Sequence, residues 1–483
     1  MSIAISGVGS GLPINEWVEA LVEVQQQKID VLVAQQEELN KKSSSLNTLK
    51  STYTSLNNAT LKFTDCLYGA SSDIFTKVTA TTSDEDGKFL TATATQLATP
   101  AVLKISVQQL ATSTSRRTYG PDSADGHQLD FSDSSMKLSD LGYDKEGSFS
   151  INGITFKVNG DTTIDGLVYQ INNSTSANVQ AHIEDGQIVL EGSEFGAKDI
   201  VIEDGEGSDF ASWIGWTDDT NLTIGQNAKF TINGKQKEST TNNLTNVETG
   251  ITGLSVELKE VTGDEVIKVN IKRESDTDAV YSALEEFVTA FNKAINDTDT
   301  QTDTEGVLHG ENQLVSIRTR LRNMVTTNVN PNGVYKSLSD IGITSGAPGM
   351  DVDEDTTSLI LDKDKFYEAF KSNPAAVKEL LIGIAADENS GTEQQLGLMQ
   401  MLQDGLDGAL STETGYFTAR SQSLSSQITN LNNKISDKED DLETYRERIT
   451  RQLNYMDQQI AQLNNQFSQM QSQLSSIGVS TGS

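Results

Sequence analysis

Near the N-terminus, apolar residues recur at a seven-residue spacing, a pattern that predicts a helix supercoiled with another helix. One seam position holds Val18, Gln25, Leu32, Leu39, Leu46, Tyr53, Thr60 and Leu67, and the other holds Leu21, Lys28, Gln35, Lys42, Leu49, Leu56 and Phe63. This seam is polar before Leu46 and apolar after it. We therefore expect the first half of the helix to need a partner in order to stay helical.

The C-terminal part of the chain carries a matching seam. It runs through Leu424, Ile428, Leu431, Ile435, Leu442, Tyr445 and Ile449, and then through Leu453, Met456, Ile460, Leu463, Phe467, Met470, Leu474 and Ile477. Two successive spacings of four, from Tyr445 to Ile449 to Leu453, form a stutter that locally unwinds a supercoil. We predict that the two terminal helices pair as a stalk. The residues predicted to form the seam of this stalk are Leu32, Leu39, Leu46, Leu49, Leu56, Leu453, Met456, Ile460, Leu463, Phe467, Met470 and Leu474.

The middle of the chain alternates apolar and polar residues, as half-buried strands do. PAVLKISVQQLA, residues 100–111, reads as one such strand. GSFSINGITFKVN (147–159) and NAKFTINGKQKES (227–239) resemble each other, and each places Asn-Gly between strand-like flanks, a strong hairpin signal. A short helix near DGLVYQINNS and strands near VQAHIEDGQIVLEGS follow the first copy. A repeated β unit is therefore predicted.

Helical spacing returns after residue 278. AVYSALEEFVTAFNKAIND and NQLVSIRTRLRNMVTT predict two helices, SLILD predicts a strand, and KFYEAFKSNPAAVKELL predicts a helical pair around Pro374. The fold class is thus α+β and multidomain, with the terminal helices paired as a coiled-coil stalk. We assign residues 1–45 and 440–483 to the stalk, partly disordered in the free protein, and 46–95 and 275–439 to a helical leg domain. Residues 96–145 and 225–274 form a β domain, and 146–224 an inserted second β domain.

Charge narrows the classes of partner. The 483 residues, enough for two to four domains, include 69 acidic and 36 basic residues, a formal charge of −33. Such a surface repels phosphate backbones and anionic headgroups, so we expect no nucleic-acid partner and no membrane insertion. A lone cysteine, Cys66, allows no intrachain disulfide. The first basic residue is Lys28 and no early run is continuously apolar, so a cytoplasmic protein is expected unless export reads an unfolded N-terminus.

No stretch predicts an enzyme, a metal site or a cofactor site. GVGSGLPINEWV (7–18) lacks the strand and spacing of a phosphate loop, and reads as a flexible leader to a helix capped by Asn15. DVDEDTTSLILD (351–362) puts Asp351, Asp353, Asp355 and Asp362 at calcium-loop positions, but Thr356 replaces the required glycine, which favours a solvated acidic turn. The scattered His127, His182 and His309 read as surface residues. The aromatics of GSDFASWIGWT (207–217) favour a small core over an exposed binding patch.

Several segments, in order along the chain, resemble the bacterial flagellar filament cap family, also called the hook-associated protein 2 family. GVGSGLPINEWVEALVEVQQQKIDVL is similar to the family's opening, with Pro13 where members often have Asp, and Gln109, Leu110 and Ala111 match its Gln-Leu-Ala signature. The β repeat from SFSINGITF to LEGSEFG is similar to one shared with flagellins. NAKFTINGK, SLSDIGITS, SNPAAVKELLIG and GYFTARSQSLSSQITNLNNKI resemble the family's C-terminal region. The flagellin signature Arg-Leu-Ser-Ser-Gly is absent from the N-terminal helix.

This resemblance implies a secreted, non-enzymatic structural protein that needs no cofactor. It would travel unfolded through the flagellar type III export channel, aided by a cytoplasmic export chaperone, to the extracellular filament tip. There a homo-oligomeric ring of about five subunits, a closed cyclic assembly, would insert the terminal helices as legs into the filament end. It would retain flagellin, promote its polymerisation, and contact the hook-filament junction proteins. Two alternatives stay open: a secreted surface adhesin and an intracellular coiled-coil scaffold.

Overall fold

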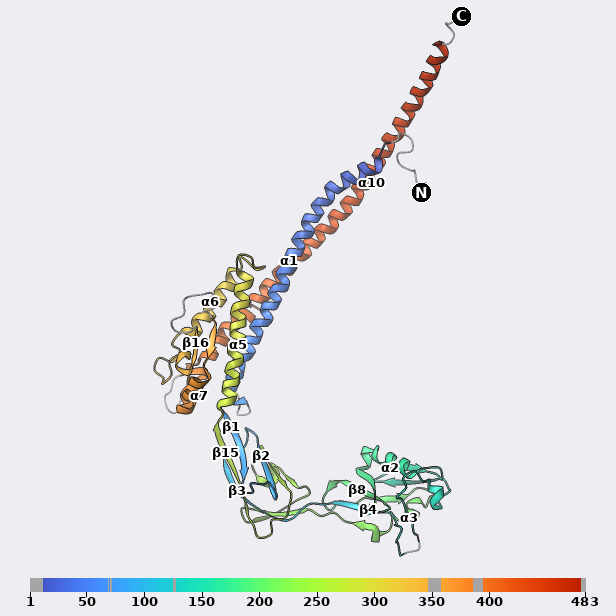
Figure 1. Cartoon of the computed structure of the whole chain (residues 1–483), viewed down its shortest axis with the longest axis vertical. Helices are drawn as coiled ribbons and strands as arrows, with labels where there is room; N and C mark the ends of the chain where they lie inside the picture. The colour runs from blue at the N-terminus through green and yellow to red at the C-terminus, as the bar shows by residue number, and fades with distance from the viewer. Residues whose placement is uncertain are drawn as a thin grey trace. The chain divides into compact units, whose positions relative to one another are not determined.

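The computed structural model describes residues 12–67, 69, 72–124, 127–345, 358–384 and 394–478 (Figure 1). The chain forms two compact units, each described separately below. Unit 1 comprises Met1–Leu67 and Thr277–Ser483, and unit 2 comprises Tyr68–Asp276. Unit 2 is therefore an insertion in the chain of unit 1.

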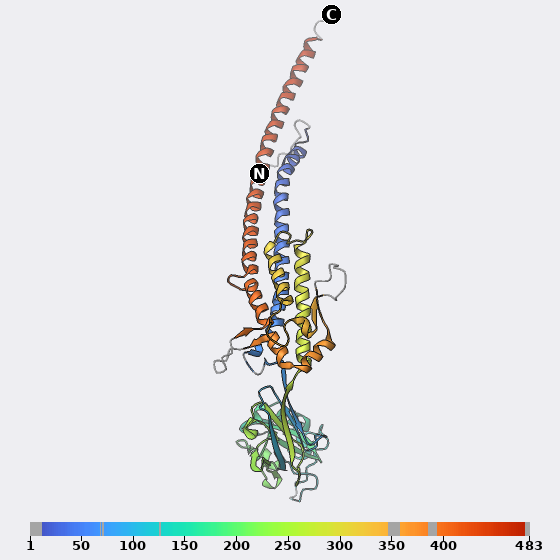
Figure 2. The same cartoon turned by 90° about the vertical axis from the view of Figure 1, so that its left-hand side faces the viewer.

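Unit 1 is built on two long helices, α1 (Ile14–Thr64) and α10 (Tyr416–Gly478), which run side by side in opposite directions (Figures 1 and 2). The interior of each contains neither Gly nor Pro, the residues that most disfavour a helix. The prediction of paired terminal helices in a multidomain α+β chain is confirmed. The predicted cap is wrong, because α1 starts at Ile14 after Pro13 and Asn15 lies inside its first turn.

Shorter elements pack around the end of the helix pair that adjoins Thr64. They are α5 (Thr277–Thr302), α6 (Asn312–Thr326), α7 (Lys363–Ser372), α8 (Pro374–Ile382), α9 (Leu398–Leu410) and the two-stranded pairs β16 (Ile343–Ser345) with β17 (Leu359–Leu361) and β18 (Gly383–Ile384) with β19 (Gln395–Leu396). The helical pair predicted around Pro374 is confirmed: Pro374 begins α8, and the Asn373 side chain accepts a 3.0 Å hydrogen bond from the Ala376 N–H. α9 went unpredicted.

The first part of unit 2 is two sheets packed over one apolar core. In the described residues the strand orders are β1-β15-β3-β11-β12 and β13-β14-β2. The bounds are β1 (Thr76–Thr82), β2 (Leu90–Ala94), β3 (Ala101–Gln109), β11 (Ala228–Ile232), β12 (Lys235–Ser239), β13 (Asn243–Leu244), β14 (Leu254–Leu258) and β15 (Ile267–Ser275), with the short α4 (Asn246–Thr249). β3 is the strand predicted within residues 100–111, and Leu103, Ile105 and Val107 face the core.

The second part of unit 2 has its own core, between sheets of order β10-β4-β8-β7 and β6-β5-β9 and two helices. The bounds are β4 (Ser113–Arg117), β5 (Gly147–Ile151), β6 (Ile154–Val158), α2 (Ile164–Asn172), β7 (Val179–Glu184), β8 (Gln187–Phe195), β9 (Ile202–Asp204), α3 (Phe210–Ile214) and β10 (Leu222–Thr223). The predicted short helix near residue 167 is α2.

Both Asn-Gly hairpins are present. Asn152 and Gly153 have φ of 50° and 83° between β5 and β6, and Asn233 and Gly234 have φ of 52° and 78° between β11 and β12. Positive φ at both positions defines the tight turn whose twist matches that of the flanking strands. The repeated unit therefore recurs once in each part of unit 2.

Two segments lie elsewhere than the sequence suggested. Residues 76–94, assigned above to the helical leg, form β1 and β2, and β4, assigned to the first β domain, belongs to the sheet of the second. β1 and β2 are rich in threonine, whose branched side chain suits a strand without giving an apolar alternation, and β4 consists of serine, threonine and arginine. Hydrophobic periodicity therefore misses them.

Candidate functional site: the two-helix stalk

The inner part of α1, residues 46–64, is buried against several helices of unit 1. Leu46, Leu49 and Leu56 are each at most 1% exposed, and the Tyr53 ring lies 5.3 Å from that of Phe417 at the start of α10. The Tyr53 hydroxyl is 2.9 Å from the Thr298 hydroxyl on α5. Here the seam positions read from the sequence face the interior of the domain.

A charged cluster joins the start of α10 to the loop before α6. The Tyr416 hydroxyl donates a 2.9 Å hydrogen bond to Glu311 Oε2, and Arg420 Nε donates one of 2.9 Å to Glu311 Oε1. Burial, together with the neighbouring carboxylate of Glu311, raises the pKa of Tyr416. Burial also raises the pKa of Tyr53. These contacts fix the inner end of the helix pair.

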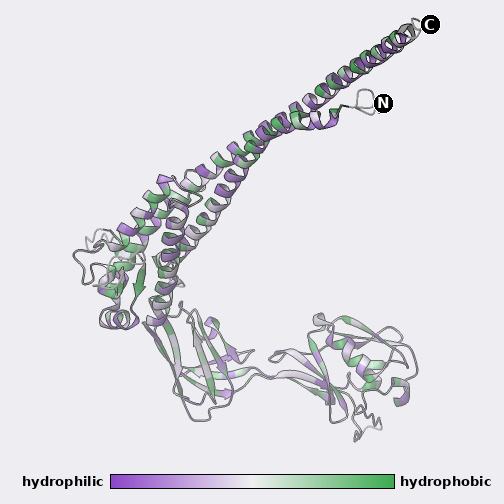
Figure 3. Ribbon diagram, turned by 45° about the horizontal axis from the view of Figure 1, so that its top comes forward, coloured by the Kyte–Doolittle hydropathy of each residue, from purple (hydrophilic) through white to green (hydrophobic). Residues whose placement is uncertain are grey.

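We call residues 14–45 of α1 with residues 431–478 of α10 the outer stalk. Its core is small: Ile29, Leu431 and Ile435 are buried, and Leu32, Val33, Leu39 and Leu442 are half-buried around them. Nearer the start of α1, Ile14 and Val18 are buried too. Figure 3 shows apolar and polar residues alternating along both helices.

The second seam position of the outer stalk differs from the one read from the sequence by one residue. Ile29 is 2% exposed, whereas Lys28 is exposed and Leu21 is 41% exposed. The Gln36 amide, seven residues after Ile29, donates a hydrogen bond to Asn432 of α10. The partner helix therefore contacts the face of α1 that carries Ile29 and Gln36, one residue along from the face that carries Lys28.

The last section of α10 keeps its apolar residues in contact with solvent. Leu453 and Ile460 are half-buried, whereas the exposed fractions are 37% for Met456, 62% for Leu463, 66% for Phe467, 56% for Met470 and 64% for Leu474. Figures 1 and 2 show α10 continuing past the start of α1 here. The predicted seam residues therefore divide into three sets. Leu46, Leu49 and Leu56 are buried in the helical core of unit 1, and Leu32 and Leu39 are half-buried against α10. Most of those in the last section of α10, from Met456 to Leu474, are exposed.

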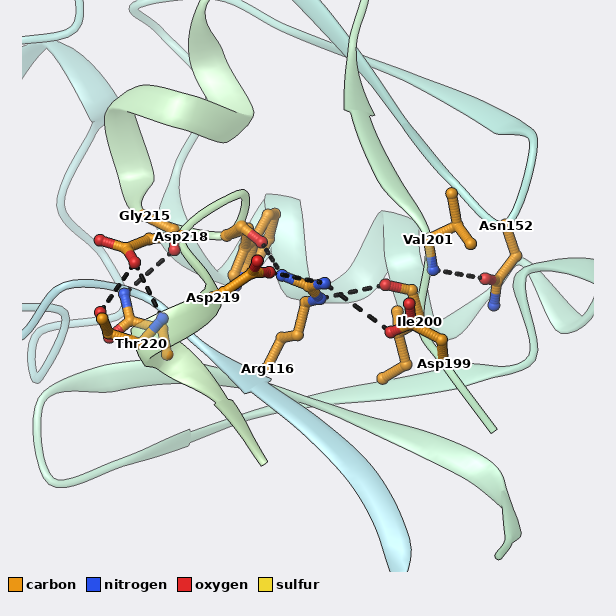
Figure 4. Close-up of polar contacts among 11 residues, drawn as sticks. Arg116, Asn152, Asp199, Ile200, Val201, Gly215, Asp218, Asp219 and Thr220 are labelled. Carbon is orange, nitrogen blue, oxygen red and sulfur yellow. Dashed lines mark hydrogen bonds and ion pairs between the residues drawn. The ribbon is translucent and has the colours of Figure 1, made fainter. Parts of the chain in front are cut away.

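In unit 2 a buried arginine is the main polar feature (Figure 4). Arg116 on β4 is 7% exposed; its Nε donates to the Ile200 carbonyl at 3.0 Å and its Nη1 to the Trp216 carbonyl at 2.9 Å. Its Nη2 lies 3.7 Å from carboxylates of Asp199 and Asp219. The guanidinium therefore holds together two loops of the second core.

Other polar contacts extend this arrangement. Asn152, the first residue of the hairpin turn, accepts a 3.0 Å hydrogen bond from the Val201 N–H. Asp218 accepts one of 2.9 Å from the Thr220 N–H, and this bond lowers the pKa of the Asp218 carboxyl. Sequence reasoning missed Arg116 because the buried face of its strand is polar, with Thr114 and Thr118 on either side of it.

The aromatic cluster of unit 2 is a core, as favoured above. Phe210 and Trp216 are fully buried, Trp213 is half-buried, and the Phe149 ring lies 5.5 Å from that of Trp216. Of these aromatic residues, Trp213 keeps part of its side chain at the surface, and the rings of Phe149, Phe210 and Trp216 are out of reach of a ligand.

The acidic segment and the histidines complete the candidate chemistry. Asp351, Asp353 and Asp355, like residues 7–11 of the leader, lie outside the described residues, and Asp362 caps α7 by accepting a 3.1 Å hydrogen bond from the Lys365 N–H. The three histidines are exposed. Across the described ranges no group of His, Cys, Asp or Glu is placed to hold a metal ion, and none of the helices there has the length and apolarity to span a membrane.

Two family descriptions match the chain. "Flagellar hook-associated protein 2 N-terminus" matches residues 10–114, and "Flagellar hook-associated protein 2 C-terminus" matches residues 225–465. The chain belongs to the flagellar hook-associated protein 2 family. The residues between the two matches, 115–224, make up most of the second part of unit 2.

Similar proteins of this family cover nearly the whole chain. The A-type flagellar hook-associated protein 2 of Pseudomonas aeruginosa is 28% identical, over 95% of this chain and 94% of its own length. The flagellar hook-associated protein 2 of Escherichia coli O157:H7 is 24% identical, over 93% and 94%. The crystal structure of the flagellar cap protein FliD D1-D2-D3 domains from Escherichia coli aligns with a TM-score of 0.50 at 22% identity, over 79% of this chain and 99% of that chain. That likeness shows a shared fold.

Proposed function

We propose that this protein caps the growing bacterial flagellar filament. A homo-oligomeric ring at the filament tip retains arriving flagellin, promotes its polymerisation and so allows elongation. The observation that carries this proposal is the family match at both ends of the chain, together with the fold shared with a flagellar cap protein. The role is structural, and the protein is not an enzyme and uses no cofactor.

The helix pair supports a leg that inserts into the filament end. The exposed apolar section from Met456 to Leu474 offers a surface that another helix could cover. The small core around Ile29 makes the outer stalk adaptable, because a short seam holds one register less firmly than a continuous Leu or Ile zipper. Residues 1–45 and 440–483 are then partly disordered in the free protein and become ordered in the assembly.

Location and partners follow from this role. The protein is exported unfolded through the flagellar type III channel with the help of a cytoplasmic chaperone, and acts outside the cell at the filament tip. Its partners are other copies of itself, flagellin and the hook-filament junction proteins. A lone cysteine suits such a passage, because no disulfide has to form afterwards. An adhesive role, prompted by the acidic middle of the chain and the Trp213 and Trp216 cluster, is not advanced as a second function, because that cluster packs in a core with Trp216 buried and Trp213 half-buried.

Deletion and complementation test the proposal. A strain lacking the protein should grow short or no filaments and release monomeric flagellin into the medium, and the full chain should restore filaments. A chain without residues 456–474 serves as the matched variant, and should be exported but fail to restore elongation. Filaments of normal length without flagellin in the medium of the deletion strain would refute the cap function.

A further inference from the structure

Two grooves flank the line along which α1 and α10 meet in the outer stalk. One is lined by Glu19, Val22, Glu23 and Gln26 of α1 and Glu439, Leu442, Glu443 and Arg446 of α10. The other is lined by Gln25, Lys28 and Ile29 of α1 and Lys438, Asp441, Leu442, Thr444, Tyr445 and Arg448 of α10. Leu442 is shared by both, so the grooves lie back to back at one level of the stalk.

Helical geometry places the grooves on opposite sides of the seam. At about 100° per residue, Glu19 and Glu23 fall on one side of the buried Ile29, and Lys28 falls on the other. On α10, Glu439 and Glu443 fall on one side of Leu442, whereas Lys438 and Arg448 fall on the other. We call these the acidic side and the basic side of the outer stalk.

The acidic side carries carboxylates that the chain does not neutralise. Glu19, Glu23, Glu439 and Glu443 are all exposed and face a single cation in their groove, Arg446. In the part of the chain that the structure describes, none of the four forms an ion pair. Along α1 the acidic side continues at every seventh residue through Glu16, Glu23, Asp30 and Glu37.

On the basic side cations outnumber carboxylates, the opposite of the acidic side, although the whole chain is strongly acidic. Its groove gathers Lys28, Lys438 and Arg448 against one carboxylate, Asp441, which lies 2.7 Å from Lys438 Nζ. Arg448 lies 5.4 Å from the centre of the Tyr445 ring, so its charge is held at the rim of the groove.

An apolar row lies beside the basic groove on α1. It consists of Trp17, Leu21, Val24 and Val31, which are 39%, 41%, 55% and 58% exposed. Their spacings of four, three and seven put them on one face of the helix, on the same side of Ile29 as Lys28. Burying this row against another surface would add a hydrophobic contribution to the pairing of charges.

We propose that neighbouring copies of this chain associate through their outer stalks, the basic side of one copy facing the acidic side of the next. The proposal rests on the ring assembly proposed above and names the surface that forms it. A closed ring needs a head-to-tail interface, in which two different patches of each copy meet. Two opposite sides of opposite charge meet that requirement, whereas a two-fold pairing of like sides would bring like charges together.

Paired charge reversals test the surface in the full-length protein. The variant Glu439→Lys/Glu443→Lys leaves Glu19 and Glu23 against three cations and so makes the groove of the acidic side basic. The variant Lys438→Glu/Arg448→Glu makes the groove of the basic side acidic. Each alone should self-associate at least about tenfold more weakly than the wild type in sedimentation experiments, because like charges then face each other. Mixed in equal amounts, the two variants should associate with each other. Added salt should weaken the association of the wild type, since exposed charges are screened within about 10 Å at moderate ionic strength.

The matched control is Asp440→Lys/Glu447→Lys, which makes the same change of charge on the face of α10 turned away from α1. It should associate as the wild type does, and circular dichroism should show equal helix content in all variants. A wild-type ring that the reversed variants form equally well, or a mixture that fails to associate, would overturn the stalk interface and leave the cap function standing. A wild-type chain that stays monomeric at every concentration and at filament ends would overturn both.

Discussion

The inner and outer parts of α1 belong to one uninterrupted helix, yet they are held in different ways. Residues 46–64 pack against α5, α9 and α10 and bury Leu49, Tyr53 and Leu56 almost completely. The cluster around Ile29 in the outer part draws all its members from α1 and α10. Helices in proteins are stable mainly through tertiary packing, so the continuity of a helix does not make it uniformly stable. Residues 46–64 therefore anchor α1 in unit 1, whereas the outer part of α1 keeps much of its surface available to partners.

Amide hydrogen exchange should show the largest difference between the two parts. Amides of residues 46–64 should exchange at least about a hundredfold more slowly than those of residues 14–40, since local opening free energies range from near zero to the global value. Assembly with further copies should slow exchange in the outer part. Equally strong protection of both parts in the isolated protein would contradict the proposed mobility.

Matched leucine truncations give the next largest effect. Leu56→Ala removes a fully buried side chain and should lower the free energy of unfolding of unit 1 by about 3 kcal/mol. Leu32→Ala, at a half-buried position, should lower it by about 1 kcal/mol or less. Urea unfolding followed by helical circular dichroism measures both. Equal losses would show that the outer stalk is packed as tightly as the inner helix.

Alkaline pH should lower the stability of the inner part of the helix pair, by less than the leucine truncation Leu56→Ala. The pKa of Tyr416 is raised in the folded protein by burial and by Glu311, above the ordinary value of 10.0. Above pH 10 the unfolded chain releases this proton while the folded chain keeps it, so the stability present at lower pH declines as pH rises through the folded pKa. Unfolding midpoints should therefore fall less steeply above pH 10 in Tyr416→Phe than in the wild type. Tyr455→Phe, at a position 66% exposed, should keep the wild-type slope.

Much of the fold can be predicted from local signals, and the exceptions have physical causes. The Asn-Gly turns at Asn152 and Asn233 are fixed by the need for positive φ, which a sequence displays directly. The register of the outer stalk is not displayed in this way, because Lys28 and Ile29 are neighbours and the partner helix decides which one faces it. A seam through Leu21 and Lys28 is polar and places Leu21 against the partner helix, whereas in the structure Leu21 lies in an exposed apolar row with Val24.

The buried polar interior of the second core in unit 2 escapes prediction for another reason. Arg116 is charged and lies in a strand made of serine, threonine and arginine, and nothing nearby in the sequence indicates that carbonyls of Ile200 and Trp216 will meet it. Its partners come from distant loops, and their approach depends on the whole second core. A pattern of apolar residues in the sequence identifies an apolar core. A buried guanidinium that links two loops has no such pattern, and is found only in the tertiary structure.

Strand pairing also bears on how the chain can change over evolution. Unit 2 opens with β1 and closes with β15, which pair from Thr76↔Ser275 to Thr82↔Val269. Within unit 2, β4 and β10 pair in the same manner, with Arg116 opposite Leu222, and residues 115–224 between the two family matches begin and end there. Unit 2 is thus one insertion in the chain, and its second part is a further insertion within it. The chain enters and leaves each insertion, here called a cassette, through adjacent antiparallel strands. A cassette whose ends already lie together can be lengthened, lost or exchanged between lineages while the helices that receive it keep their sequence and their role.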